Sequence, residues 1–178
     1  MATEEDREAA RSLAAVARLA VARVPGGDPA RTVLGRGRSW LLSRMDRARG
    51  KEHPGTGWRD SWSRERPGWR ERAAYLGGNE VFSVDFQVCR RCRLGWVEQP
   101  STVAKYRRCG LATAALAALR SEHPGIEWHT LGGHLADSVP FWLSAGAGIP
   151  GGYTQRDPCP HHHTGRGLSR LRYRRDSR

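Results

Sequence analysis

The chain has 178 residues, enough for one domain of ordinary size with a small extension. Lysine and arginine number 30 against 18 acidic residues, which gives a formal net charge of +12. No apolar run reaches the length of about 18 residues needed to cross a bilayer, and the acidic N-terminus "MATEEDREAARS" argues against a secretory signal. We therefore expect a cytoplasmic protein without a membrane partner, whose excess of arginine attracts polyanions, including a phosphorylated cofactor.

The first 74 residues are expected to form an N-terminal helix and an arginine- and tryptophan-rich segment, packed on the rest or partly flexible. Residues 4–24 begin with acids and end with arginine, as the helix dipole favours. Their apolar stripe consists of Leu13, Val16, Ala20 and Val24. The tryptophans that follow, at positions 58, 62 and 69, either stack on bases or anchor a polar segment onto a core, and we favour the anchor.

Residues 75–165 show a different pattern, in which strands and helices alternate. Residues 80–88 alternate apolar and polar side chains, as in a half-buried strand, and residues 93–99 are predicted to return as its partner. A helix from residue 111, a short strand at 126–132 and a second helix at 135–146 follow. This order predicts an α/β fold, and residues 166–178 remain as a basic tail.

The stretch "KYRRCGLATAAL", residues 105–116, has the composition of an anion-binding helix start. The first turn of a helix has unpaired amides and the positive end of the dipole. Gly110 leaves those amides accessible, while Arg107 and Arg108 add positive charge. We therefore expect this stretch to bind a pyrophosphate.

The pattern Arg107-x-x-Gly110-x-Ala112 resembles the acyl-CoA-binding motif of the GCN5-related N-acetyltransferases, and "DSVPFWLSAG" is similar to a later helix of that superfamily. The resemblance covers residues 80–150. It implies a mixed central sheet flanked by helices, with an N-terminal helical extension, and transfer of an acetyl group from acetyl-CoA to an amine substrate. It also implies a set of cofactor-binding residues: Thr102, Val103, Arg107, Arg108, Cys109, Gly110, Leu111, Ala112 and Thr113.

Within that implied site, Thr102 and Val103 would pair with the pantetheine arm, and the amides from Arg108 onward would hold the pyrophosphate. Cys109 is interpreted as filling space rather than acting as a nucleophile.

Three residues are candidates for the catalytic base: Glu98, His129 and His134. Glu98 is preferred, because a carboxylate at that end of the strand would face the cleft. Trp142 stands where the superfamily commonly has a tyrosine that protonates the leaving thiolate, and it has no acidic proton to give. The alternative function is therefore a module of this fold without turnover, zinc-stabilised and associated with nucleic acid.

The stretch "CRRCRLGW" predicts a zinc knuckle at the tip of a hairpin. Two further ligands are needed, and "DPCPHHH" supplies a cysteine and one of three histidines. The predicted set is Cys89, Cys92, Cys159 and His161, which would hold a structural Zn²⁺. Free thiols and a redox pair remain alternatives to the metal.

Overall fold

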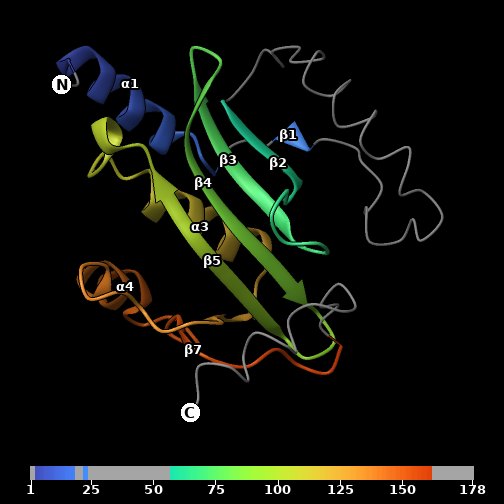
Figure 1. Ribbon diagram of the computed structural model, residues 1–178. Helices are drawn as coiled ribbons and strands as arrows, with labels where there is room; N and C mark the ends of the chain where they lie inside the picture. The colour runs from blue at the N-terminus through green and yellow to red at the C-terminus, as the bar shows by residue number, and fades with distance from the viewer. Residues whose placement is uncertain (1–2, 19–21, 24–56, 162–178) are drawn as a thin grey trace.

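The computed structural model describes residues 3–18, 22–23 and 57–161, and these form an α/β fold with a mixed sheet (Figure 1). The strands follow the order β1-β2-β3-β4-β5-β6-β7 across the sheet. They are β1 (Ala22–Arg23), β2 (Trp58–Trp62), β3 (Arg70–Leu76), β4 (Asn79–Cys89), β5 (Leu94–Thr102), β6 (Glu127–Thr130) and β7 (Thr154–Gln155). The helices are α1 (Glu4–Ala15), the 3₁₀ helix η2 (Ala104–Tyr106), α3 (Leu111–Glu122) and α4 (Val139–Gly146). The α/β class expected from the sequence is confirmed.

Strand direction divides the sheet into two parts. Strands β2, β3, β4 and β5 form successive antiparallel pairs. Strands β5, β6 and β7 run parallel to one another, and β1 runs parallel to β2. A parallel neighbour requires a crossover connection, and α3 provides it between β5 and β6. The loop before α3 therefore begins where β5 ends and is the first part of this crossover connection.

The main core lies between the sheet and helices α1 and α3. On β4 the side chains of Phe82, Val84 and Phe86 are buried in this core, as the alternating pattern predicts. Burying one such aromatic or aliphatic side chain contributes roughly 1.5–3 kcal/mol. Helix α3 contributes Leu116 and Leu119, both fully buried, so its packing fixes the loop that precedes it.

Helix α1 ends at Ala15, earlier than the predicted residue 24, although positions 20 and 24 of the predicted stripe lie outside the described residues. Thr3 and Asp6 form a capping box at its start. Near its end, the Trp58 indole donates a hydrogen bond to the Leu13 carbonyl at 2.8 Å. This bond satisfies one of the carbonyls that a helix C-terminus leaves unpaired.

Strands β2 and β3 lie in the segment for which the sequence predicted no strands, and β3 crosses residue 74, where the first segment was expected to end. Trp58 and Trp69 are buried, so the anchoring interpretation is confirmed for these two. The strands were missed because charges occupy core-facing positions. Arg72 is fully buried and binds Asp60 through two hydrogen bonds of 2.8 and 3.0 Å.

No helix among the described residues combines the length and apolar character needed to span a bilayer. Residues 166–178, expected to form a basic tail, lie outside the part of the chain that the structure describes.

Candidate metal centre and anion-binding loop

Strands β5 and β6 separate along their length. They pair at three positions, the last joining Trp96 to His129, while β5 continues to Thr102. Beyond the last pair, the carboxylate of Glu98 accepts a hydrogen bond of 2.6 Å from the Leu131 amide. A side chain thus bridges the two strands where their backbones no longer pair.

The same part of β5 contains a β-bulge. Its register with β4 shifts between Ser83 and Asp85, and Gln99 on β5 has a φ of 49°. A positive φ is uncommon for a residue with a side chain, and bulges of this kind recur near functional sites, where they redirect the strand. The bulge bends β5 just beyond the position where it parts from β6.

The predicted anion-binding residues lie in the loop between β5 and α3. Gly110 is the N-cap of α3, with a φ of 84° that favours glycine. The first helical hydrogen bond runs from the Ala114 amide to the Gly110 carbonyl at 2.9 Å. The amides of Leu111, Ala112 and Thr113 precede that bond and lack helical acceptors, as at any helix start. Amides at a helix start are able to donate hydrogen bonds to a phosphate group.

Helix α1 holds this loop from the side. Asp6 accepts a hydrogen bond from the Tyr106 hydroxyl at 3.4 Å and pairs with Lys105 at 3.5 Å. Cys109 is buried in the main core, in keeping with a filler residue. Arg107 and Arg108 are both exposed, and Arg107 donates to the Thr102 carbonyl at 3.3 Å.

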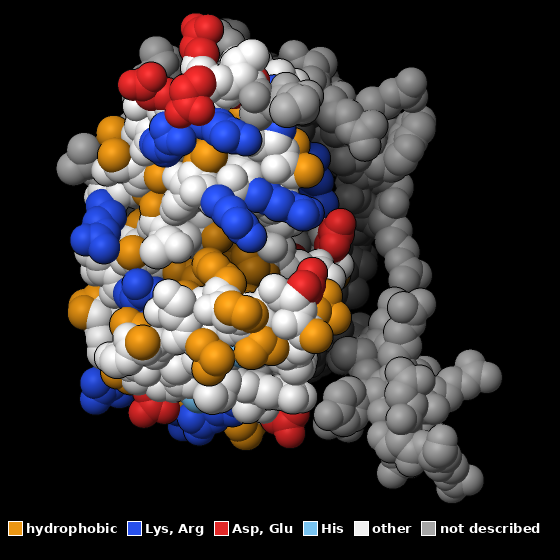
Figure 2. Space-filling model, turned by 90° about the vertical axis from the view of Figure 1, so that its left-hand side faces the viewer, with side chains coloured by type: hydrophobic (Ala, Val, Ile, Leu, Met, Phe, Trp, Pro, Cys, Tyr) orange, Lys and Arg blue, Asp and Glu red, His pale blue; other side chains and the backbone are white. Residues whose placement is uncertain are grey.

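At Val103 the backbone amide donates to the Val81 carbonyl at 3.0 Å and the carbonyl accepts a hydrogen bond of 2.8 Å from the Tyr106 amide, so both groups are already paired within the chain. Its side chain is among the exposed large hydrophobic residues of the described chain, which are Val103, Leu135, Val139 and Leu143. Figure 2 shows the face on the left-hand side of Figure 1, where basic side chains lie above a hollow with a hydrophobic floor and further hydrophobic side chains lie below it. The hollow therefore has a charged side and an apolar side.

The three predicted catalytic residues contact different partners. On β6, His129 lies between the Thr154 carbonyl, 3.3 Å from Nδ1, and Arg156, 3.2 Å from Nε2. His134 instead stacks on Trp142 with a centroid separation of 4.8 Å. Glu98 alone lies directly beyond the last pair of β5 and β6.

Two charged neighbours of Glu98, the basic Arg66 and the acidic Asp85, were missed by the sequence analysis. Arg66 lies 3.5 Å from the Glu98 carboxylate and 3.4 Å from that of Asp85. Burial raises the pKa of Asp85, although a hydrogen bond from Ser63 and the charge of Arg66 act in the opposite direction. Arg66 belongs to a segment with many arginines, so no local signal singles it out.

A buried phenol near Trp142 was also missed. Tyr153 is fully buried, its ring centroid lies 5.4 Å from that of Trp142, and its hydroxyl accepts a hydrogen bond of 2.6 Å from Arg120. Burial raises the pKa of this phenol, against the influence of Arg120. Tyr153 therefore packs in the core and presents no hydroxyl at an open surface.

The four predicted metal ligands come together. One ligand atom from each of Cys89, Cys92, Cys159 and His161 lies within 4.8 Å of every other. Cys89 ends β4 and Cys92 lies in the turn to β5, while Cys159 and His161 follow β7. Three thiols and an imidazole at these distances form a cluster that could bind a metal such as zinc.

No family model, curated protein or solved structure matches this chain.

Hydrogen bonds and burial shift the pKa values of two cysteines of the cluster in opposite directions. Burial opposes ionisation of Cys89, but hydrogen bonds from the Cys92 and Arg91 amides and from neighbouring thiols lower its pKa. Burial and the sulfurs of Cys159 and Cys89 raise the pKa of Cys92 to about 11. Repulsion between neighbouring thiolates keeps Cys92 protonated in the absence of a cation, whereas a bound metal ion would stabilise all three thiolates.

The segment after β7 is fixed to the sheet before it reaches the cluster. The Arg156 amide donates to the Thr130 carbonyl at 2.9 Å, and its carbonyl accepts a hydrogen bond of 3.1 Å from the Trp96 indole. Beside the cluster, Trp69, Leu94 and Trp96 form a second, smaller core. These contacts bring Cys159 beside the β4–β5 turn.

Proposed function

We propose that this chain is an acyltransferase of the GCN5-related kind, which moves an acetyl group from acetyl-CoA to an amine. The observation that carries this proposal is the continuation of β5 beyond its last pair with β6 into a loop with exposed arginines and a glycine-started helix. The free amides of that helix suit the pyrophosphate, and the parted strands leave an edge for the pantetheine arm.

The proposed reaction is a direct transfer. The nitrogen of the neutral amine attacks the thioester carbonyl, a C–N bond forms, the C–S bond breaks, and coenzyme A leaves as a thiolate that takes up a proton. The amine loses one proton in the same process, and Glu98 is our candidate to accept it because it lies where β5 and β6 part. Holding both reactants next to each other would lower the barrier, because it removes the entropic cost of bringing them together during the reaction.

A second candidate is a module that binds acyl-CoA without turnover. It is favoured by the engagement of Glu98, whose carboxylate already accepts from Leu131 and lies near Arg66. The burial of Trp142 and Tyr153 also favours it, because neither presents an acidic proton at an open surface.

The deciding experiment follows the melting temperature of the full chain during titration with acetyl-CoA. A ligand at one hundred times its dissociation constant stabilises the folded state by about 2.7 kcal/mol, which corresponds to a rise of roughly 5–10 °C for a domain of this size. Gly110→Glu places a carboxylate at the anion site and should abolish the rise. The matched control is Gly77→Glu, which introduces the same charge at another glycine of positive φ, with open space around it.

An unchanged melting temperature of the wild-type protein at millimolar acetyl-CoA would contradict both candidates. If the temperature rises, release of the coenzyme A thiol in the presence of a panel of primary amines separates them. Thiol release above the uncatalysed rate supports transfer, whereas its absence supports the binding module.

We also propose that the cluster of Cys89, Cys92, Cys159 and His161 holds Zn²⁺. Tetrahedral sites of three cysteines and one histidine are typical of structural zinc, and four protein ligands leave no position open for catalysis. The ion would join the β4–β5 turn to the segment after β7 and would take no part in acyl transfer.

A further inference from the structure

The turn that carries two of the metal ligands also presents a concentrated positive charge. Arg90, Arg91 and Arg93 are all exposed, and within the described ranges no ion pair joins any of them to a carboxylate. The turn is compact, because the Arg93 amide donates to the Arg90 carbonyl at 3.3 Å and Arg93 has a φ of 56°. Three arginines therefore lie on one short turn, and we call Arg90, Arg91 and Arg93 the arginine tip.

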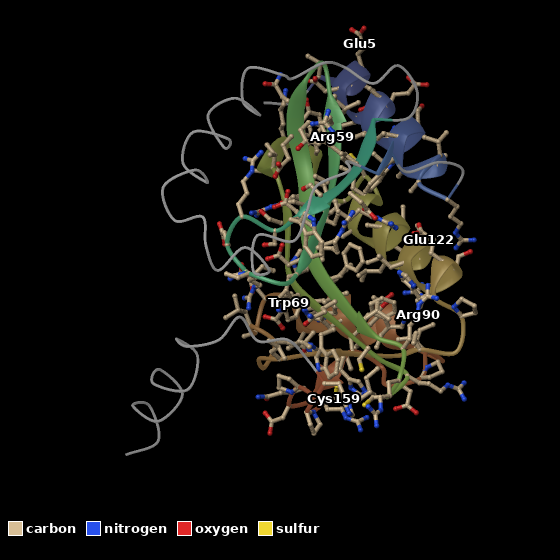
Figure 3. All side chains as sticks on the ribbon, turned by 90° about the vertical axis from the view of Figure 1, so that its right-hand side faces the viewer. Glu5, Arg59, Trp69, Arg90, Glu122 and Cys159 are labelled. Atoms are coloured by element: carbon tan, nitrogen blue, oxygen red, sulfur yellow. The ribbon has the colours of Figure 1, made fainter. Side chains whose placement is uncertain are left out.

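A hollow of about 380 Å³ adjoins the arginine tip, and Arg90, Arg93, Glu122 and His123 are among its lining residues. Figure 3 shows Arg90 on the same side of the molecule as Glu122, with Cys159 farther along. The two arginines that line the hollow outnumber Glu122, whose carboxylate pairs at 2.9 Å with the buried Arg72 that Asp60 also shares. The net charge around the hollow is thus positive.

His123 adds a flat, uncharged surface to this region. Burial lowers its pKa, and although Glu122 opposes this, the charges of Arg90 and Arg72 act in the same direction as burial. The Arg93 guanidinium donates to the Gly125 carbonyl at 3.1 Å, which orients it along the rim while its charge stays uncompensated. Oriented guanidinium groups bind phosphate oxygens in a bidentate manner that lysine does not reproduce.

The surroundings of the arginine tip favour nucleic acid over a membrane surface. Binding to a bilayer usually adds apolar side chains that enter the interface, and the exposed large hydrophobic residues of the described chain lie elsewhere, at Val103 and in or before α4. The net charge of +12 attracts a polyanion over a distance.

We propose that the arginine tip is a binding site for the phosphate backbone of a nucleic acid, held in shape by the metal cluster beneath it. The expected contacts are to phosphates, so the site recognises the charge and spacing of the phosphate groups and has no base preference. This site is separate from the acyl-CoA loop and does not depend on acyl transfer.

Fluorescence anisotropy with a labelled 20-nucleotide single strand and the corresponding duplex tests this proposal on the full chain. We expect Arg90→Glu with Arg91→Glu to weaken binding at least about tenfold at low salt and to reduce the slope of log K against log salt by about 2 for the duplex. The control is Arg7→Glu with Arg18→Glu, two exposed residues of the N-terminal segment, which changes the net charge equally. This control should weaken binding less than about threefold, as expected for net charge alone.

A Lys-for-Arg pair, Arg90→Lys with Arg91→Lys, keeps the charge but loses the bidentate contacts, so its affinity should fall between those of the wild type and the Glu pair. All variants should melt like the wild type, since the substituted side chains are exposed. Absence of binding at low salt, equal losses in the tip and control variants, or tighter binding to anionic vesicles or polyglutamate than to the oligonucleotides would each overturn the proposal.

Discussion

The sulfur of Cys92 lies 3.2 Å from Nδ1 of His161, although 69 positions separate the two residues along the chain. Forming a contact between residues this far apart in the sequence costs loop-closure entropy. The binding free energy of a metal ion would offset that cost and stabilise the folded state. The metal cluster is therefore expected to contribute to the stability of the whole β4–β5 end of the sheet.

Purified protein should contain about one zinc ion per chain by atomic emission, and a strong chelator should lower the melting temperature of the wild type. Cys92→Ser removes one of the four ligands and should lose most of the metal, because three remaining ligands hold zinc more weakly. Its melting temperature should then no longer respond to chelator. Cys109→Ala, at a cysteine outside the cluster, is the control and should keep its metal. Metal-free wild-type protein, purified without chelator, would count against the site.

Arg72 is fully buried between two carboxylates and links β3 to both β2 and α3. We expect Arg72→Leu to lower the free energy of unfolding by about 3–5 kcal/mol, because it leaves Asp60 charged and unpaired in the core. Urea denaturation measures the loss. Combining Arg72→Leu with Asp60→Leu should recover part of it, since no buried charge then remains on these two strands. A double variant less stable than the single one would show that the ion pair itself, rather than the unpaired carboxylate, decides the stability.

Glu98 accepts a hydrogen bond from the Leu131 amide where β5 and β6 separate. We expect Glu98→Ala to destabilise the fold by about 1–3 kcal/mol, because it leaves that amide without its partner. Glu98→Gln keeps an acceptor oxygen and should cost less. If the carboxylate is the base of an acyl transfer, Glu98→Gln also lowers kcat without changing the melting shift produced by acetyl-CoA. Equal turnover in Glu98→Gln and the wild type would remove the catalytic role.

We expect His129 to make folding stability depend on pH. Burial lowers its pKa, and Arg156 acts in the same direction, although the Thr154 carbonyl and Glu127 oppose the shift. The unfolded chain therefore binds a proton near pH 6.5 that the folded protein does not yet bind, so this contribution to stability is lost as the pH falls from about 6.5 through the folded pKa.

Melting temperatures of the wild type and His129→Gln between pH 7.5 and 5 measure this effect. The variant should lose less stability on acidification than the wild type. His123 shifts in the same direction, so the variant should retain part of the dependence. Identical pH profiles would mean that His129 is not held neutral by the fold.

The local patterns were enough to predict several elements. Alternation at residues 80–88 gave β4, and the helix formers after Gly110 gave α3, because each signal depends on the chemistry of neighbouring residues. The metal ligands could also be predicted, since a Cys-x-x-Cys turn needs two more donors and the described cluster uses those in the later Cys-His stretch. The prediction that these four side chains meet is confirmed.

Only the tertiary structure revealed β2 and β3 as strands of the sheet and the role of the charges within them. The partners of Arg72 come from β2 and α3, and their pairing depends on a register that no single segment encodes. The bridge between Glu98 and Leu131 likewise appears only once β5 and β6 are laid side by side. Sequence alone therefore determined what each segment favours and which ligand types were present, whereas long-range packing decided which charges are buried together and which face solvent, because burial belongs to the assembled sheet rather than to any one stretch of chain.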